Sequence, residues 1–200
     1  QGEFGISHQE QMTYARTADE SLPVVAIAAI LQHNTSGFAS PQDKKIKRPR
    51  DFEGKKYGGW GSPVEEAMIK TLMEIDDADF SKTEIVTIGT IDFFAAVSEY
   101  VDYTWIYYGW DGIASEVKKF PINFIFLQDY ARELDFYTPV IITREQLLKE
   151  EPELVYRFLR ATEKGYLFTI DNPKIAIQDL LKHAPEIDAE IAIASQEYLA

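Results

Sequence analysis

The sequence predicts an α/β protein in which strands alternate with helices around a mostly parallel sheet. Residues 23–32, PVVAIAAILQ, are a continuous apolar run, which is typical of a strand buried on both faces of a parallel sheet. Residues 55–75, KKYGGWGSPVEEAMIKTLMEI, indicate a short strand, a glycine-rich turn and a capped helix. Strand, turn and helix in this order are how α/β proteins build small binding sites.

Composition narrows the possible functions. The 200 residues suit one domain or parts of two, and the hydrophobic content of 46% is sufficient for a core. The net charge is −13, and the short basic run Lys44–Arg50 is interrupted by Pro49, which argues against a nucleic-acid partner. The sequence contains no cysteine, which excludes disulfides, thiolate metal sites and cysteine nucleophiles.

The elements can be followed along the chain. A short strand at Phe4–Ile6 and a helical segment at 7–20 precede the apolar run at 23–32. The polar, proline-containing segment 41–55 is the best candidate for a crossover between two lobes.

The helix after Gly61 has a strong start signal. Ser62 is the expected N-cap, Pro63 suits the first turn, and Glu65 completes a capping box. Helical spacing predicts a buried stripe that is interrupted by Thr71 and consists of Val64, Ala67, Met68, Leu72 and Ile75.

In the second half of the chain, strands alternate with short helical segments before the sequence becomes helical throughout. Strands are expected at 83–89, 101–112, 124–131 and 136–143, with a short helix at 90–99. From Thr143 onward the sequence is helical: Thr143 and Gln146 form a second expected capping box, and further helices are expected to open at Pro152, Pro173 and Pro185.

The turn Gly58–Ser62 is the first candidate site. Glycines let a ligand approach the backbone, and a helix N-terminus offers free N–H groups to a carboxylate, a phosphate or a neutral polar group. The nucleotide-binding patterns GxxxxGK[ST] and GxGxxG are absent. Capping alone would explain Ser62 and Glu65, but Trp60 between two glycines favours ligand contact.

The second candidate is Trp105–Gly112, WIYYGWDG, at the expected carboxyl end of a strand. Aromatic faces stack on flat rings, and a carboxylate accepts hydrogen bonds from ring amines. We expect Tyr108, Trp110 and Asp111 to contact a ligand and Trp105 to pack in the core. The alternative is an aromatic core in which Asp111 is only a turn residue.

Two further clusters flank expected strands. His8, Gln9 and Glu10 follow the first strand, and Tyr137 lies at the start of the segment 136–143, where the chain is expected to return between the lobes; plain strand packing is an equally good explanation of Tyr137. Binding is favoured over structural capping and over acid–base catalysis for the first cluster. The three histidines lack the HxxxH and HExxH metal spacings, and no GxSxG nucleophile motif is present, so we expect neither a metal site nor a catalytic residue.

Four blocks carry a family resemblance: FGISHQEQMTYAR, GKKYGGWGSPVEEAMIKTLM, YYGWDGI and LDFYTPVIIT. In this order, they resemble the substrate-binding proteins related to the fungal thiamine-pyrimidine synthases. The resemblance implies a periplasmic-binding-protein fold of type II, with two α/β lobes joined by crossovers and ligand in the cleft. The family's opening strand and a WxPNxxH-like segment have no counterpart before Gln1, so the resemblance also implies that the first lobe is incomplete in this chain.

The resemblance assigns lobes and contacts. Residues 1–47 would be part of lobe 1, residues 48–136 lobe 2, and residues 137–200 the return to lobe 1 with C-terminal helices. The implied ligand contacts are those already singled out from the residues, and they are His8, Gln9, Glu10, Trp60, Gly61, Ser62, Trp110 and Asp111.

The resemblance also implies a function. We expect a monomeric solute-binding protein that delivers a thiamine-precursor aminopyrimidine to an ABC permease, with no cofactor, located outside the inner membrane as a periplasmic protein or lipoprotein. One alternative is a pyrimidine synthase like the fungal branch, which consumes bound pyridoxal phosphate and a histidine and uses iron with a cysteine-rich motif; the lack of cysteine departs from that pattern. The other alternative is a different cargo, such as riboflavin or an alkylsulfonate.

Overall fold

The computed structural model describes residues 2–200, which fold as two compact units. Among these residues, unit 1 comprises 2–34 and Phe136–Ala200, and unit 2 comprises Thr35–Asp135. The division into lobes stays a prediction, and the chain enters unit 2 at Thr35, before the lobe boundary expected after residue 47. The reason is that residues 36–41, expected to lie outside any strand, form a strand in the middle of the unit 2 sheet.

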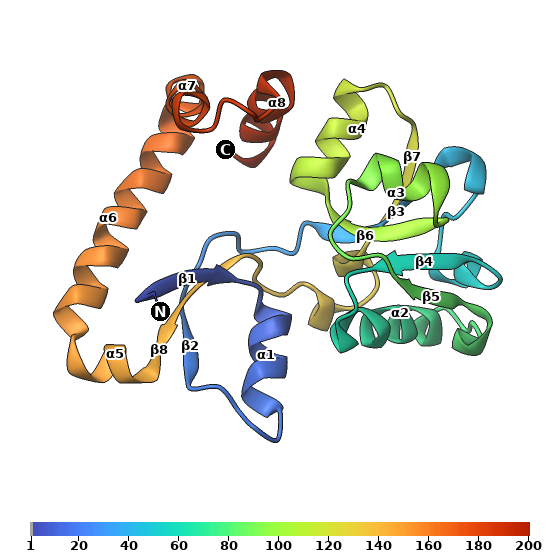
Figure 1. Ribbon diagram of the computed structural model, residues 1–200, viewed down its shortest axis with the longest axis horizontal. Coiled ribbons are helices and arrows are strands. Elements are labelled where there is room, and N and C mark those ends of the chain that lie inside the picture. Colours follow the sequence, from blue (N-terminus) through green and yellow to red (C-terminus); the bar gives the residue numbers. More distant parts are fainter. Residues whose placement is uncertain (1) are drawn as a thin grey trace. The chain divides into compact units, whose positions relative to one another are not determined.

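Unit 2 contains a mixed five-stranded sheet (Figure 1). The strand order is β5-β4-β6-β3-β7; β4 pairs in parallel with β5 and β6, whereas β3 pairs antiparallel with β6 and β7. The predicted predominance of parallel pairing is thus only partly met. The strands are β3 (Ser36–Pro41), β4 (Lys56–Gly59), β5 (Glu84–Thr87), β6 (Tyr103–Tyr107) and β7 (Ile122–Phe126).

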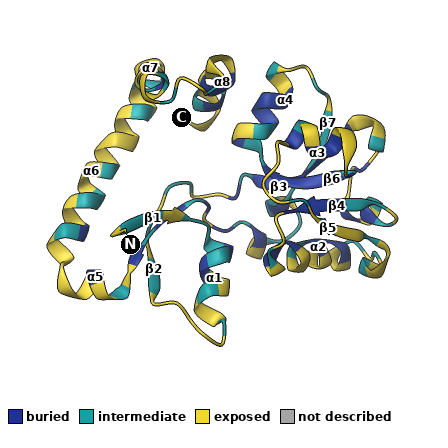
Figure 2. Cartoon of the chain, viewed as in Figure 1, coloured by how far each residue is buried: buried dark blue, intermediate teal, exposed yellow. Residues whose placement is uncertain are grey.

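Helices cover both faces of this sheet: α2 (Pro63–Ile75) lies on one face, and α3 (Phe93–Glu99) and α4 (Ile113–Val117) lie on the other (Figure 1). Alternation along the strands separates two cores. Phe38, Tyr57 and Tyr103 form an aromatic cluster on the α2 face, while Ala39 and Ile106 pack with α3 on the opposite face. Burial is accordingly greatest along β3, β4 and β6 (Figure 2).

The strand β3 leaves no space for a side chain at Gly37. A Cβ built there would lie 2.2 Å from the carbonyl oxygen of Ile125 and 2.8 Å from the Phe124 ring. Both neighbours belong to β7, which pairs directly with β3. Glycine therefore allows these two strands to approach each other.

The capping box at Ser62 and Glu65 is confirmed, but the buried stripe of α2 is rotated from the expected one. Ala67, Thr71 and Ile75 are exposed. The rotation follows from the burial of Glu65, whose carboxylate turns inward instead of facing solvent. The buried positions are Val64, Glu65, Ile69, Leu72 and Met73.

Unit 1 contains a three-stranded antiparallel sheet in the order β1-β8-β2. The strand at 24–29 is an edge strand of intermediate burial, so the expectation that this run is buried within a parallel sheet is wrong. The strands are β1 (Phe4–Ser7), β2 (Val24–Ala29) and β8 (Val140–Arg144); the helices are α1 (Gln9–Thr17), α5 (Glu145–Glu150), α6 (Pro152–Asp171), α7 (Pro173–His183) and α8 (Ala189–Leu199).

The helix starts at Pro152 and Pro173 are confirmed, whereas two other predicted starts are wrong. The Thr143 hydroxyl donates to the carbonyl of Glu3 at 2.6 Å, so it ties β8 to the N-terminal strand and does not cap α5. The last helix begins at Ala189 instead of Pro185, because Asp188 accepts hydrogen bonds from the backbone of Glu190 and Ile191. Within residues 2–200, no helix is both long and apolar enough to span a membrane.

Candidate ligand-binding site

Three neighbouring parallel strands of unit 2 end at one edge of the sheet. Their carboxyl ends lead into the turn Trp60–Ser62 after β4, into Thr87 at the end of β5, and into Tyr108–Gly112 after β6. Gly61 lies against Thr87, since a Cβ on Gly61 would come within 3.0 Å of the Thr87 Cγ2 atom. This edge is where ligands bind in open α/β sheets, and two of the four predicted clusters meet there.

The carboxylate of Glu65 organises the turn after β4. One oxygen, Oε1, accepts hydrogen bonds from the Tyr57 hydroxyl at 2.6 Å and from the Trp60 backbone N–H at 3.1 Å. The other, Oε2, accepts from the N–H groups of Gly61 at 2.8 Å and Ser62 at 2.7 Å. The turn amides that were expected to face a ligand are therefore already bonded within the protein.

This carboxylate also explains two glycines of the turn. A Cβ on Gly59 would lie 1.9 Å from Glu65 Oε1, so a side chain at this position would displace the carboxylate. Gly61 has φ of +91°, a conformation that residues with a side chain rarely adopt. The turn thus needs glycine on either side of Trp60.

All three tryptophans lie at or near this edge. The exposed fractions are 43% for Trp60 and 42% for Trp110, whereas Trp105 is buried. The Trp60 and Trp105 rings are tilted against each other with centroids 5.6 Å apart. The buried Nε1 of Trp105 has no hydrogen-bond partner among the described residues, which leaves one donor unused beside the exposed Trp60 ring.

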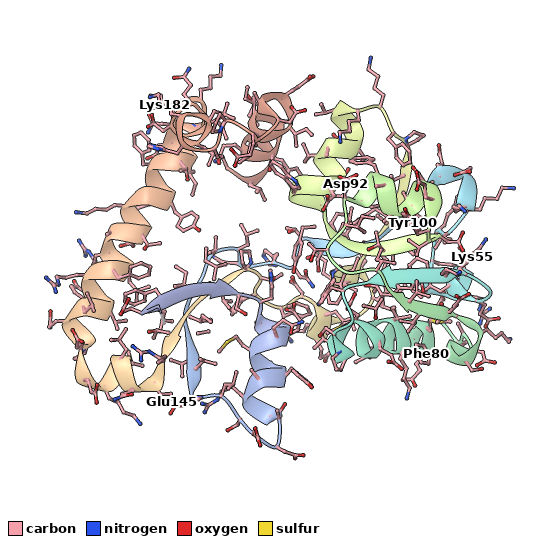
Figure 3. All side chains as sticks on the ribbon, in the orientation of Figure 1. Lys55, Phe80, Asp92, Tyr100, Glu145 and Lys182 are labelled. Atoms are coloured by element: carbon pink, nitrogen blue, oxygen red, sulfur yellow. The ribbon has the colours of Figure 1, made fainter. Side chains whose placement is uncertain are left out.

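Asp111 lies in a π-helical turn, Tyr108–Gly112, because β6 ends at Tyr107. In a strand, adjacent side chains point to opposite faces of the sheet. Because Trp110 and Asp111 lie in the turn and not in the strand, both can reach the same ligand. Burial, followed by the like charge of Asp92, raises the pKa of Asp111 to about 6. Asp92 precedes α3 and caps it by accepting from the Ala95 N–H at 3.1 Å (Figure 3).

Tyr108 is engaged in packing. Its ring contacts Phe124 and Phe126 at centroid distances of 5.1 and 5.4 Å, and its hydroxyl donates to Glu116 at 2.5 Å. These contacts hold the π-helical turn against α4 and β7. Ligand contact by Tyr108 stays a prediction.

The predicted residues of unit 1 also come together. His8 precedes α1, and its Nδ1 is 2.9 Å from the Thr138 hydroxyl. Gln9 Oε1 accepts from the backbone N–H of Tyr137 at 2.8 Å, and the Tyr137 ring is exposed. Burial lowers the pKa of His8, which favours the neutral imidazole.

Glu10 is the buried carboxylate of this cluster. It is 8% exposed, and its Oε2 has no hydrogen-bond partner among residues 2–200. Burial raises the pKa of Glu10 to about 7. An unpartnered buried oxygen of this kind is available to a donor from a ligand, or otherwise costs stability when it is charged.

Replacing Glu10 by glutamine is expected to stabilise the protein at alkaline pH only. The folded state keeps the Glu10 carboxyl protonated up to about pH 7, whereas the unfolded state releases this proton near pH 4.5. The free energy of unfolding therefore falls as the pH rises between these two values. Glu10→Gln should raise the free energy of unfolding by about 1–3 kcal/mol at pH 8 and change it little at pH 4. Urea denaturation of both proteins at each pH measures this.

The parent and Glu10→Gln are compared at the same pH, so the contribution of His8 to stability cancels between them. That contribution has the opposite pH dependence: because the pKa of His8 is lowered in the folded state, His8 reduces the free energy of unfolding as the pH falls below its unfolded pKa. An equal effect of Glu10→Gln at pH 4 and pH 8 would show that Glu10 is not buried as a lone carboxylate.

No group of three or more His, Cys, Asp or Glu side chains within residues 2–200 is arranged to hold a metal ion. Unit 2 by itself offers two exposed indole faces and a partly buried carboxylate at one edge of its sheet. These groups can hold a flat ring that carries hydrogen-bond donors.

Two features of the site were missed from sequence. Glu65 was assigned to capping alone, because nothing in its spacing from Tyr57 or Trp60 indicates that it also bonds them. The unused Nε1 donor of Trp105 was missed because an aromatic strand residue is expected to pack, and burial of one ring nitrogen cannot be inferred from the sequence pattern.

The sequence is similar to characterised proteins over most of its length. A family model described as NMT1/THI5 like matches residues 1–176. The formylaminopyrimidine-binding protein of Halalkalibacterium halodurans is 26% identical over 191 residues, which cover 92% of this chain and 55% of that protein. The chain therefore spans about half the length of this curated relative.

Solved structures share the fold at low sequence identity. The periplasmic aliphatic sulphonate binding protein SsuA from Escherichia coli superposes with a TM-score of 0.76 at 12% identity, covering 98% of this chain and 61% of that one. The desulfurization enzyme DSZB superposes with a TM-score of 0.57 at 11% identity, covering 94% of this chain and 68% of that one. The chain thus has the periplasmic-binding-protein fold, as predicted, and this fold is compatible with both binding and catalysis.

Proposed function

The chain belongs to the NMT1/THI5-like family, and on that premise we propose that it is the solute-binding protein of an ABC importer for a small flat heterocycle. The cargo we propose is an aminopyrimidine that serves as a precursor of thiamine. The similarity to a formylaminopyrimidine-binding protein supports this choice of ring.

One observation carries the proposal: two exposed indoles and one partly buried carboxylate lie at the carboxyl edge of the unit 2 sheet. Trp60 and Trp110 offer faces on which a pyrimidine can stack, and Asp111 can accept a hydrogen bond from a ring amine. Gly61, Ser62 and Tyr108 shape this edge. His8, Gln9, Glu10 and Tyr137 supply polar groups on unit 1, and we propose that they also contact the ligand.

The proposed role is capture and delivery without chemistry. The described clusters supply hydrogen-bond donors, acceptors and ring faces, which are the groups that hold a ligand. We propose that the protein acts as a monomer outside the inner membrane, in periplasmic or lipid-anchored form, and hands its cargo to the permease. The family also contains a synthase branch, so product formation is the second point to test.

A panel of ligands tests the proposal on the full chain. Thermal unfolding is followed with formylaminopyrimidine, aminomethyl- and hydroxymethyl-pyrimidines, riboflavin and ethanesulfonate, and positive results are titrated by calorimetry. We expect stabilisation by the aminopyrimidines alone. Stabilisation by riboflavin or ethanesulfonate alone would show that the cargo is that compound class and not an aminopyrimidine. If no compound stabilises the protein, the proposed binding role is wrong.

A separate incubation tests for synthase activity. The protein is mixed with pyridoxal phosphate and Fe²⁺, and the products and the intact protein mass are measured. We expect no pyrimidine product and no change of mass. A consumed histidine together with a pyrimidine product would assign the protein to the enzymatic branch.

A further inference from the structure

The start of α2 has the geometry of an anion site. Three consecutive backbone N–H groups, those of Trp60, Gly61 and Ser62, point toward one position at a helix N-terminus, where the helix dipole favours negative charge. The position is occupied by the protein's own Glu65 carboxylate. Glu65 is 2% exposed, so the carboxylate is fixed and shielded from water.

The remaining donors of this turn are used as well. The Val64 N–H donates to the Ser62 hydroxyl at 3.3 Å, and the Glu65 N–H donates to the Ser62 carbonyl at 3.1 Å. The fourth donor on the carboxylate is the Tyr57 hydroxyl, which is fully buried. An incoming anion would therefore find no free N–H group in this turn and would meet a fixed negative charge.

The other charged groups near the carboxyl edge of unit 2 add to this effect. Asp111 and Asp92 are both carboxylates, and each contributes negative charge to the edge. The positive charge of Lys118 acts on Asp111 in the opposite direction, and the Lys118 Nζ lies 4.0 Å from the centre of the Phe94 ring. The backbone N–H groups of Trp60, Gly61 and Ser62 all donate to the Glu65 carboxylate.

We propose that Glu65 is a specificity-determining residue that makes the site reject anions, so that the ligand is an uncharged or protonated heterocycle and not a sulfonate or a phosphate ester. The proposal rests on the function proposed above and narrows its substrate class. Glu65 acts through the backbone of the turn. Its carboxylate accepts the hydrogen bonds of the three N–H groups that could otherwise bind an anion, and its negative charge repels an anion. Donor groups on the ligand can still be matched by Asp111, because a carboxylate can accept several hydrogen bonds.

Calorimetric titration of the full chain at low ionic strength tests the proposal, with ethanesulfonate, inorganic phosphate and formylaminopyrimidine as probes. The parent protein should bind neither anion at millimolar concentration. Glu65→Ala, which frees three N–H groups and removes the charge, should gain affinity for one or both anions by about tenfold or more. Glu65→Gln should gain less, because its amide oxygen still accepts hydrogen bonds.

Glu66→Ala is the matched control. Glu66 is the next residue of α2 and is exposed, so this variant has the same net charge as Glu65→Ala but an intact turn. Circular dichroism checks the fold of each variant, and if Glu65→Ala does not fold, Glu65→Gln decides. Anion binding by the parent, or folded Glu65 variants without any gain, would overturn the proposal; if neither variant folds, the titration of the parent decides alone.

The two proposals fail separately. If the parent does not bind formylaminopyrimidine but the Glu65 variants gain anion affinity, the proposed cargo is wrong and the role of Glu65 stands. If the parent binds formylaminopyrimidine and also ethanesulfonate with similar affinity, the cargo stands and the role of Glu65 is wrong.

Discussion

Trp110→Ala and Asp111→Asn are each expected to weaken ligand binding by about tenfold or more, the factor that corresponds to about 1.4 kcal/mol. An indole stacked on a base contributes about 1–3 kcal/mol, and a hydrogen bond to a charged group about 1.5–3 kcal/mol. Both residues lie in the π-helical turn after β6, so one ligand can contact both. Calorimetric titration with formylaminopyrimidine measures the loss.

Two control variants on the same unit separate site effects from general ones. Tyr100→Ala removes an exposed aromatic ring after α3 (Figure 3). Asp129→Asn removes an exposed carboxylate after β7. Both should bind as the parent does. If Trp110→Ala or Asp111→Asn binds with the affinity of the parent, the substituted residue serves packing or the turn and does not contact the ligand. If both variants do so, the ligand binds elsewhere than at this edge.

Gly37→Ala is expected to lower the free energy of unfolding by about 3 kcal/mol or more. Its Cβ would lie 2.2 Å from the Ile125 carbonyl oxygen, a backbone atom of the adjacent strand that cannot move without breaking the β3–β7 ladder. Urea denaturation followed by circular dichroism measures the change.

Gly165→Ala is the control for this substitution. Gly165 lies inside α6, and a Cβ there would meet no atom within 4 Å. Relief of the low helix propensity of glycine should stabilise this variant by about 0.5–1 kcal/mol. If Gly37→Ala were as stable as the parent, the close approach of β3 to β7 would be wrong.

Local signals predicted the elements better than the pairing. The box at Ser62 and Glu65, the prolines at 152 and 173 and the strand–turn–helix order are each decided within a few residues of chain, and they are confirmed. The antiparallel edge position of β2 depends on β8, more than a hundred residues later, and an apolar run carries no information on its partner.

The candidate site shows the same division. The clustering of Trp60 with Trp110 and Asp111 at one sheet edge could be expected from strand ends, because parallel strands share an edge. The inward rotation of Glu65 could not, since a glutamate at the third helical position satisfies a capping box whether or not it also bonds Tyr57. The error in the buried stripe of α2 has the same origin.

The distribution of tryptophan gives the protein a built-in optical reporter. All three tryptophans belong to unit 2, and two of them are the exposed rings proposed to stack on the ligand. Intrinsic fluorescence excited at the indole band therefore reports on the occupancy of this edge and on the melting of unit 2. Melting of unit 1 produces no tryptophan signal and must be followed through its tyrosines or its helical content.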